Sequence, residues 1–413
     1  MTFGPFGVGR LDGRAVMVPN AAPGDLLEVT VTEQRAGHLV ARAERVLKPG
    51  AARRTPPCPY LPRCGGCDWQ QITYPEQVRF KAEVAAAALN RALGLQFDPA
   101  RLVEPAPQEF GYRARIRFKA ARGGRLGFYE AGSRRLVEVE RCMVAAEQIR
   151  MPREFALAIE CEEIEVVADR GREVLVAHLA RPPGPAVVER ARRLVAGDAR
   201  IAGAVLRSSR AREVVGEASI AVALEPGLEL EADADLFSQV NRAQNLKLVA
   251  AVMEMAAAGM GARVLDLFCG AGNFSLPAAR RGAQVMGVDA DALAVAAAAR
   301  NAQRLGFTRA EFAAMAAAEL AQFLLRARYR PDVVILDPPR SGARDLIEPL
   351  VRMRAAQVIY VSCDVATLAR DLRALCAGGG YRIAALRAFD FFPNTHHIEV
   401  VAQAVLTSAP TRS

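Results

Sequence analysis

The chain has 413 residues, 52% of them hydrophobic, which is enough for two or three domains with buried cores. The sequence contains no apolar run of membrane-spanning length and no cleavable signal pattern, so we expect a soluble, cytoplasmic protein. A formal net charge of +9, mostly from arginine, favours a polyanionic partner such as a nucleic acid. Eight cysteines in a cytoplasmic protein argue against a disulfide framework and for metal or catalytic roles.

Residues 1–54 alternate apolar and polar side chains between turn signals, as in 14–19 and 27–32. The pattern predicts a small all-β, OB-like barrel, and barrels of this kind often bind oligonucleotides. We therefore expect an RNA-binding unit at this end of the chain.

A cysteine-rich loop follows, in which Cys58, Cys64 and Cys67 form a C-x5-C-x2-C run among prolines and glycines. Three thiolates on one loop can bind one face of a metal or cluster if a distant residue closes it, and Cys142 is our candidate for the fourth ligand. Four thiolates suit an iron–sulfur cluster and also zinc, so counting ligands leaves both open. The remaining isolated cysteines are expected to be ordinary small apolar residues. These are Cys161, Cys269 and Cys376.

The middle of the chain, residues 55–236, is predicted to be a β-rich α+β domain with one helix from about Glu76 to Leu93, which we expect can pack on the domain that follows, 237–413. The run 112–118 alternates so that Arg113, Arg115 and Arg117 share one strand face. An arginine ladder beside aromatic residues fits single-stranded RNA, and a solvated sheet face is the alternative.

From about residue 260 the pattern becomes strand, glycine turn, helix, strand. The expected strands are 264–268, 285–288, 333–336 and 358–361, with helices to about 281 and 301. This alternation predicts a doubly wound parallel sheet over 237–413, with its ligand at the carboxyl ends of the strands.

The glycine turn after the first of these strands lacks both the dinucleotide fingerprint and the lysine of a P-loop. Asp289, at the end of the next strand, is placed to accept hydrogen bonds from ribose hydroxyls, and Gly270 and Gly272 let the chain pass close to a ligand. The arrangement resembles the class I S-adenosylmethionine methyltransferases.

Two kinds of methyl acceptor are compatible with these residues, an exocyclic nitrogen and C5 of a pyrimidine. The tetrad Asp337-Pro338-Pro339-Arg340 is related to one found in enzymes that methylate exocyclic nitrogens, but Arg340 replaces the stacking aromatic. Methylation at C5 of a pyrimidine instead needs a thiolate that adds to C6 and a base that removes the C5 proton. Cys363, just ahead of a helix that would favour its thiolate, fits the first role, and Glu399 fits the second.

These motifs, in this order along nearly the whole chain, resemble those of the RNA 5-methyluridine methyltransferases. Within that family the chain looks most like the 23S rRNA (uracil-5-)-methyltransferases, which have an N-terminal TRAM barrel and a [4Fe-4S] cluster. The resemblance implies methylation of C5 of a uridine in 23S rRNA through a covalent adduct between Cys363 and C6, with Glu399 as the base. It implies that the cluster is held by Cys58, Cys64, Cys67 and Cys142.

The resemblance also implies a set of S-adenosylmethionine contacts, which are Gln239, Asp266, Phe268, Gly270, Gly272, Asp289, Asn301 and Asp337. One departure is Asp364, which follows Cys363 where relatives often have asparagine. The alternatives that stay open are a tRNA 5-methyluridine methyltransferase and an RNA-binding iron–sulfur protein without activity. No obligate protein partner is evident from the sequence.

Overall fold

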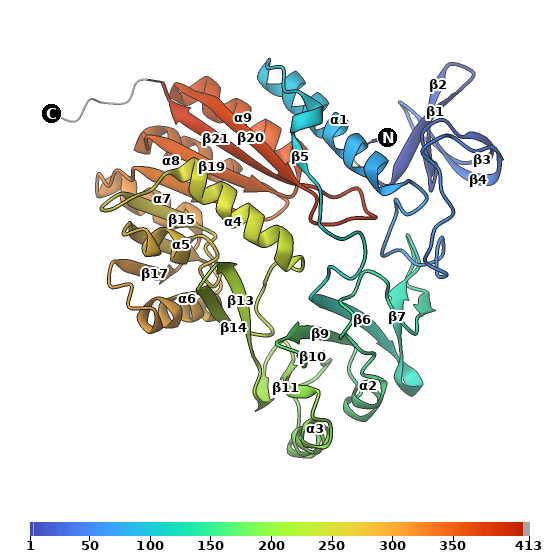
Figure 1. The fold of residues 1–413 in the computed structure, drawn as a ribbon, viewed down its shortest axis with the longest axis horizontal. Coiled ribbons are helices and arrows are strands. Elements are labelled where there is room, and N and C mark those ends of the chain that lie inside the picture. The colour runs from blue at the N-terminus through green and yellow to red at the C-terminus, as the bar shows by residue number, and fades with distance from the viewer. Residues whose placement is uncertain (3, 408–413) are drawn as a thin grey trace.

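The computed structural model describes residues 1–2 and 4–407. Its elements form an all-β unit at the N-terminus, a β-rich middle and a large α/β unit that holds the C-terminal half (Figure 1). The expected fold class, a class I methyltransferase-type sheet preceded by all-β and α+β parts, is confirmed. None of the helices in the described part of the chain is both long and apolar enough to span a membrane.

The N-terminal unit is a four-stranded sheet with the order β1-β2-β4-β3. Its strands are β1 (Phe6–Leu11), β2 (Arg14–Pro19), β3 (Leu26–Gln34) and β4 (Leu39–Lys48). Alternate residues of β2 and β4 point inward, so Val16, Val18, Leu39 and Ala41 form a small core of their own.

The middle unit is a seven-stranded sheet with the order β12-β11-β10-β9-β6-β7-β8. Its strands are β6 (Arg115–Ala121), β7 (Arg125–Tyr129), β8 (Leu136–Glu138), β9 (Glu163–Asp169), β10 (Arg172–His178), β11 (Ile201–Arg207) and β12 (Arg212–Gly216). Helices α2 (Arg153–Ile159) and α3 (Pro185–Gly197) cover one face. The other face packs on the hairpin of β13 (Ser219–Glu225) and β14 (Leu228–Asp233), which joins this unit to the α/β unit.

The α/β unit is built on an eight-stranded sheet with the order β17-β16-β15-β18-β19-β21-β20-β5. Its strands are β5 (Val103–Glu104), β15 (Arg263–Leu267), β16 (Gln284–Asp289), β17 (Ala310–Ala314), β18 (Val333–Leu336), β19 (Gln357–Ser362), β20 (Tyr381–Phe389) and β21 (Glu399–Leu406). Its helices are α4 (Arg242–Ala256), α5 (Ser275–Arg280), α6 (Ala292–Arg304), α7 (Ala317–Arg326), α8 (Ile347–Met353) and α9 (Val365–Gly379). Strands β15 to β19 run parallel, and β21 is antiparallel to β19 and β20.

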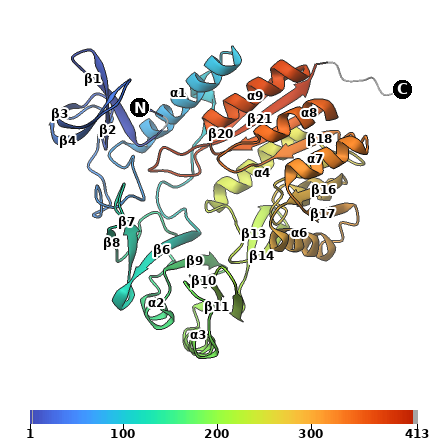
Figure 2. The same ribbon diagram turned by 180° about the vertical axis from the view of Figure 1, so that it is seen from behind.

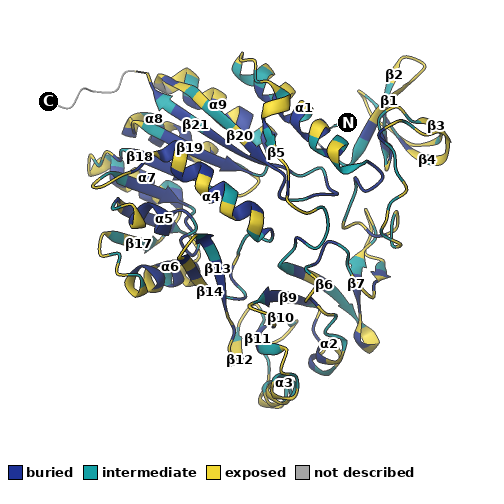
Figure 3. Cartoon of the chain, in the orientation of Figure 1, coloured by how far each residue is buried: buried dark blue, intermediate teal, exposed yellow. Residues whose placement is uncertain are grey.

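The central strands of this sheet are buried on both faces, which explains their continuous apolar sequences. Successive residues alternate between two cores: Leu265 and Leu267 pack toward α7, α8 and α9, whereas Val264 packs toward α4 and α5. Figure 3 shows these strands as the most buried part of the molecule. The sheet is therefore a rigid frame for the residues at its carboxyl edge.

One segment of the predicted central domain packs with the α/β unit. Helix α1 (Tyr74–Leu93) begins two residues before the predicted start and lays Ala85 and Leu89 into the core beside α9. Strand β5 pairs in parallel with β20 at the edge of the large sheet. Figures 1 and 2 both show α1 alongside α9, so this N-terminal helix covers part of one sheet face.

Candidate active site

A cavity of about 60 Å³ lies at the carboxyl ends of β15 and β18. Several of the predicted cofactor contacts line it, namely Gln239, Phe268, Gly270 and Asp337. The sequence around residue 238 comes from far upstream, so the fold brings the Phe237-Ser238-Gln239 segment onto the glycine turn. The structure therefore gathers four of the eight predicted contacts around one space.

The turn after β15 has an unusual backbone that ties two strand ends together. Phe268 has a φ of 67°, which is uncommon for a residue with a side chain, and Gly272 has a φ of 103°. A Cβ on Gly272 would also meet Leu276 at 2.9 Å. The Gly270 amide donates a hydrogen bond of 3.0 Å to Asp289 Oδ2, which fixes the turn to the end of β16. Glycine is thus required at 272 for both conformation and space.

Asp266 lies in β15 beneath this turn and is fully buried. Its Oδ2 accepts a 2.5 Å hydrogen bond from Ser275, whereas its Oδ1 has no hydrogen-bond partner within the described part of the chain. Burial, with a smaller contribution from Asp289, raises the pKa of Asp266 to about 7. A buried acceptor without a protein partner, in the strand that leads into the glycine turn, is free to accept a hydrogen bond from a bound cofactor.

Asn301, like Asp266, Gly272 and Asp289, is not among the residues that line the cavity. Its side-chain amide is used within the fold. Its Oδ1 accepts from the Glu231 amide at 2.8 Å, and its Nδ2 donates to Glu231 O at 2.7 Å and Ala297 O at 2.9 Å. The residue thus joins β14 to α6, and a cofactor contact by Asn301 stays a prediction.

Two asparagines of the site were not singled out from the sequence. Asn273 lines the cavity and exchanges hydrogen bonds of 2.9 and 3.2 Å with Asn245 of α4. Asn273 could have been predicted as a site residue from its position in the glycine turn. Asn245 lies within α4, where no local sequence motif marks it. Phe237 lies at the rim of the same cavity and is 75% exposed.

Cys363 and Glu399 are brought together by strand pairing. In the antiparallel ladder between β19 and β21, Ser362 stands opposite Val400. One further step in the same register sets Cys363 opposite Glu399, at the edge where Asp337 follows β18. Residues that are distant in the sequence thus become neighbours because β21 folds back between β19 and β20.

The thiol of Cys363 is held mainly in its protonated form. Burial, the nearby Glu399 and, to a lesser extent, Asp337 raise its pKa to about 11, and Arg340 opposes them. Our expectation that the helix end would favour a thiolate is therefore outweighed by burial in this structure. Asp364 acts as the N-cap of α9, accepting from the Thr367 amide at 2.8 Å.

The two carboxyl groups of the site are also shifted by burial. The pKa of Glu399 is raised well above its usual range, by burial first and then by Asp337. The pKa of Asp337 is raised to about 7 by burial together with Asp266 and Asp289. Arg340 favours the ionised forms of both Cys363 and Glu399. A thiol, a buried carboxyl group and a guanidinium thus lie within electrostatic reach of one another, as nucleophilic and general-base chemistry requires.

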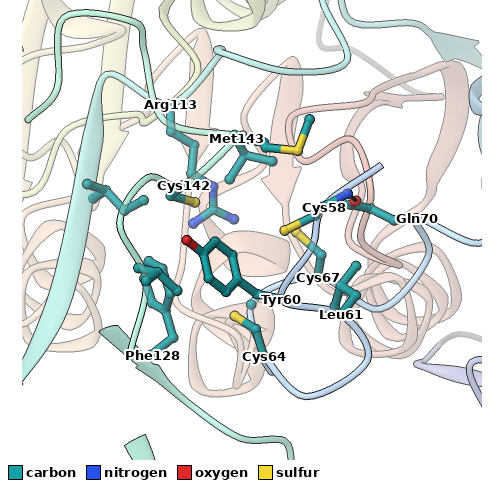
Figure 4. A pocket seen from close by; sticks show the side chains of 14 residues that line it. Cys58, Tyr60, Leu61, Cys64, Cys67, Gln70, Arg113, Phe128, Cys142 and Met143 are labelled. Atoms are coloured by element: carbon teal, nitrogen blue, oxygen red, sulfur yellow. Dashed lines mark hydrogen bonds between the residues drawn. The ribbon is translucent and has the colours of Figure 1, made fainter. Parts of the chain in front are cut away.

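The four predicted ligand cysteines line one cavity of about 40 Å³ in the cysteine loop and the segment around residue 142. Figure 4 shows the thiols of Cys58, Cys64, Cys67 and Cys142 around the space that Tyr60 and Arg113 also enter. Burial raises the pKa of Cys67 to about 12 and that of Cys64 and Cys142 above the usual range. In residues 1–2 and 4–407, however, no three His, Cys, Asp or Glu side chains converge tightly enough to ligate a metal ion.

Of the arginines in the 112–118 run, Arg113 and Arg115 are partly buried, whereas the side chain of Arg117 is 51% exposed. Arg113 points into the cysteine cavity, Arg115 donates to the carbonyl groups of Ala234 and Leu236, and Arg117 pairs with Glu165. The strand alternates as predicted, but the cysteine loop covers Arg113 and the 234–236 segment covers Arg115, so only Arg117 of the predicted ladder is exposed. RNA contact by this face stays a prediction.

Comparisons with known proteins agree with this geometry. Residues 226–406 match the family model for tRNA (uracil-5-)-methyltransferase. The 23S rRNA (uracil(1939)-C(5))-methyltransferase RlmD of Shewanella amazonensis is 32% identical, over 96% of this chain and 92% of its own. The protein of the same name from Alkalilimnicola ehrlichii is 34% identical, over 96% and 93% respectively.

Among solved structures, a tRNA (uracil-54, C5)-methyltransferase of Pyrococcus abyssi, in complex with S-adenosyl-L-homocysteine, superimposes with a TM-score of 0.73. It is 25% identical, and the match covers 97% of this chain and all of that one. Sequence and fold thus agree, and the chain belongs to the RNA (uracil-5-)-methyltransferase family.

Proposed function

We propose that this protein methylates C5 of a specific uridine in 23S rRNA, with S-adenosylmethionine as the methyl donor. The proposal rests on the register of β19 and β21, which, continued one step beyond Ser362 and Val400, sets Cys363 opposite Glu399. Asp337, which lines the cavity, is close enough to both residues to raise their pKa values. A nucleophile and a base on one sheet edge, next to a donor cavity, are the groups that carbon methylation needs.

The reaction follows from these groups. The Cys363 thiol gives up its proton to solvent, and its sulfur bonds to C6 of the uracil, which turns C5 into a nucleophilic enolate carbon. C5 then takes the methyl group from the sulfonium, releasing S-adenosylhomocysteine. Glu399 removes the C5 proton, and the sulfur–C6 bond breaks to return the thiolate and 5-methyluridine. The raised pKa of Glu399 makes its ionised form a stronger proton acceptor in the last step.

We assign the donor contacts to the residues gathered at the cavity. Gln239, Phe268, Gly270, Gly272 and Asp337 form its walls or its turn, with Asp289 holding the turn from the next strand. Asp266 contributes its buried Oδ1, which has no hydrogen-bond partner among the described residues. The Pyrococcus abyssi enzyme was solved with S-adenosyl-L-homocysteine bound, which supports a donor of this class.

We propose ribosomal RNA as the substrate in place of tRNA, because the relatives named for 23S rRNA are 32–34% identical to this chain, against 25% for the tRNA enzyme. The target base must leave its stack, which costs a few kcal/mol and favours a loop or single-stranded uridine. The N-terminal sheet (1–54) is proposed to add RNA affinity, and a net charge of +9 predicts that this affinity falls with salt.

The test is methyl transfer from labelled S-adenosylmethionine to unmodified 23S rRNA and, separately, to unmodified tRNA, followed by mapping of the labelled base. We expect 5-methyluridine at a single region of 23S rRNA, and no product with Cys363→Ala. Label confined to tRNA would overturn the substrate, and label on a nitrogen would overturn the reaction.

We also propose that the cysteine cavity holds a [4Fe-4S] cluster. The donor set fits, because all four thiols face one space and the cluster takes four cysteine ligands. Cys58, Cys64, Cys67 and Cys142 would each bind one iron of such a cluster, which would need their sulfurs less tightly converged than around a single zinc ion. The Arg113 guanidinium enters the same space and forms no ion pair with any described residue. A cluster held by four thiolates would supply the negative charge that balances this cation.

Iron and acid-labile sulfide content of anaerobically purified protein, with its visible absorption spectrum, tests this proposal. We expect about four irons per chain, and loss of both iron and stability in Cys64→Ser. Stoichiometric zinc instead would show that the site is a zinc site. A Cys64→Ser variant with unchanged metal content and thermal stability would remove Cys64 from the ligand set.

A further inference from the structure

The residue directly after the cysteine loop holds the loop that leads to Glu399. Asp68 Oδ1 accepts the His396 amide at 3.0 Å, and Asp68 Oδ2 lies 2.6 Å from His396 Nδ1. The backbone amides of Asp68 and Trp69 both donate to the carbonyl oxygen of Asn394, at 3.1 and 3.0 Å. Two adjacent residues thus make four contacts with a segment more than 300 positions away.

That segment, residues 390–398, connects β20 to β21 and has no helix or strand of its own. Asn394 is fully buried with a φ of 69°, a conformation that costs free energy unless the surroundings impose it. Glu399 is the first residue of β21, so the position of its carboxyl group depends on how this connection is held.

The contact continues from His396 toward the reacting groups. The His396 ring lies against that of His397, with centroids 4.0 Å apart, and His397 Nε2 is 3.4 Å from Arg340. Burial, with His396 and Arg340, lowers the pKa of His397 to about 4, so its ring is neutral near pH 7. Arg340 in turn favours the ionised forms of Cys363 and Glu399, because its positive charge lowers the pKa of each. Asp68 itself lines neither the donor cavity nor the cysteine cavity.

We propose that Asp68 is a positioning residue for the last chemical step: through His396 it sets the 390–398 connection, and so the Glu399 carboxyl group, in the geometry that removes the C5 proton. The inference rests on the proposed function, because it concerns the base of that reaction. It also connects the cysteine loop to the active site, because a peptide bond joins Cys67 of that loop to Asp68.

A displaced base should affect one step selectively. Addition of Cys363 to C6 and methyl transfer to C5 do not need Glu399, so they should proceed, whereas removal of the C5 proton should slow. The methylated adduct, with sulfur still bonded to C6, should then accumulate on ordinary RNA. A displacement of about 1 Å costs on the order of 100-fold in rate, which sets the scale of the expected loss.

The experiment compares full-length wild type, Asp68→Ala and Asp68→Asn in three measurements. These are turnover, the fraction of enzyme bonded to unmodified target RNA on a denaturing gel during turnover, and the rate of bonding to 5-fluorouridine-substituted RNA. For Asp68→Ala we expect turnover to fall about 10- to 100-fold and adduct with ordinary RNA to accumulate, while 5-fluorouridine bonding stays near the wild-type rate. Asp68→Asn keeps an acceptor for the His396 amide and should fall in between.

Asp25→Ala serves as the matched structural control, because Asp25 also holds loop amides and an arginine, Arg53, but in the N-terminal unit. It should not raise the adduct fraction. Turnover of Asp68→Ala close to wild type, or a parallel fall in turnover and 5-fluorouridine bonding, would overturn the positioning role. Absence of any 5-fluorouridine adduct in wild type would overturn the proposed function itself, and this inference with it.

Discussion

Replacing Lys81 with methionine would leave a buried carboxylate without its counter-charge where α1 meets the 390–398 connection. Lys81 Nζ lies 2.6 Å from Asp390 Oδ1 and donates a 3.0 Å hydrogen bond to Phe392 O. Both side chains of the pair have 0% exposure. Removing one partner of such a pair costs about 3–5 kcal/mol, because the other charge remains buried alone. We expect Lys81→Met to lower the free energy of unfolding by that amount.

Urea unfolding, followed by circular dichroism and by tryptophan fluorescence of Trp69, measures this change. Arg387→Met is the control, since Arg387 pairs with Glu254 at 2.7 Å but with 48% and 67% side-chain exposure. Its expected cost is below about 1 kcal/mol. The double variant Lys81→Met/Asp390→Asn should be more stable than Lys81→Met, because no buried charge is left. A loss below about 1 kcal/mol for Lys81→Met would refute the reasoning.

Two further predictions concern titration. The pKa of Asp266 is about 7 in the folded protein, against an ordinary value of 3.8. Because the folded state binds this proton more tightly than the unfolded state, the free energy of unfolding should fall as the pH rises between these two pKa values. The loss should be roughly 4 kcal/mol at most. Asp266→Asn should therefore be more stable than wild type at pH 8 and similar at pH 4, as thermal unfolding at both values would show; a difference independent of pH would contradict this assignment. Arg340→Gln removes the cation that favours ionised Cys363 and Glu399, so the rising limb of the pH–rate profile should move to higher pH; a profile that only scales down would count against it.

The fold was largely predictable because its signals are local. Apolar runs ending in Asp266-Leu267, Asp289 and Asp337 read as buried parallel strands, and the sheet brings their ends together as expected. Cys363 and Glu399 were found from their motifs, but only the return of β21 between β19 and β20 explains why they are neighbours.

Long-range contacts were not predictable from residue patterns. Asn301 sits on a helix, and no sequence pattern showed that its amide would exchange hydrogen bonds with Glu231, 70 positions away. The alternation of polar and apolar residues placed Arg113 on one strand face, but it could not show that the cysteine loop covers the Arg113 side chain. The contact between Asp68 and His396 joins residues 328 positions apart and carries no local signal.

The most direct test of the account is covalent trapping with 5-fluorouridine-substituted RNA and S-adenosylmethionine, read on a denaturing gel. Fluorine at C5 cannot leave as a proton, so the sulfur of Cys363 should stay bonded to C6. We predict an adduct with 23S rRNA fragments that is absent with Cys363→Ala and weak or absent with tRNA. No adduct with either RNA, using anaerobically purified protein, would contradict carbon methylation by this chain.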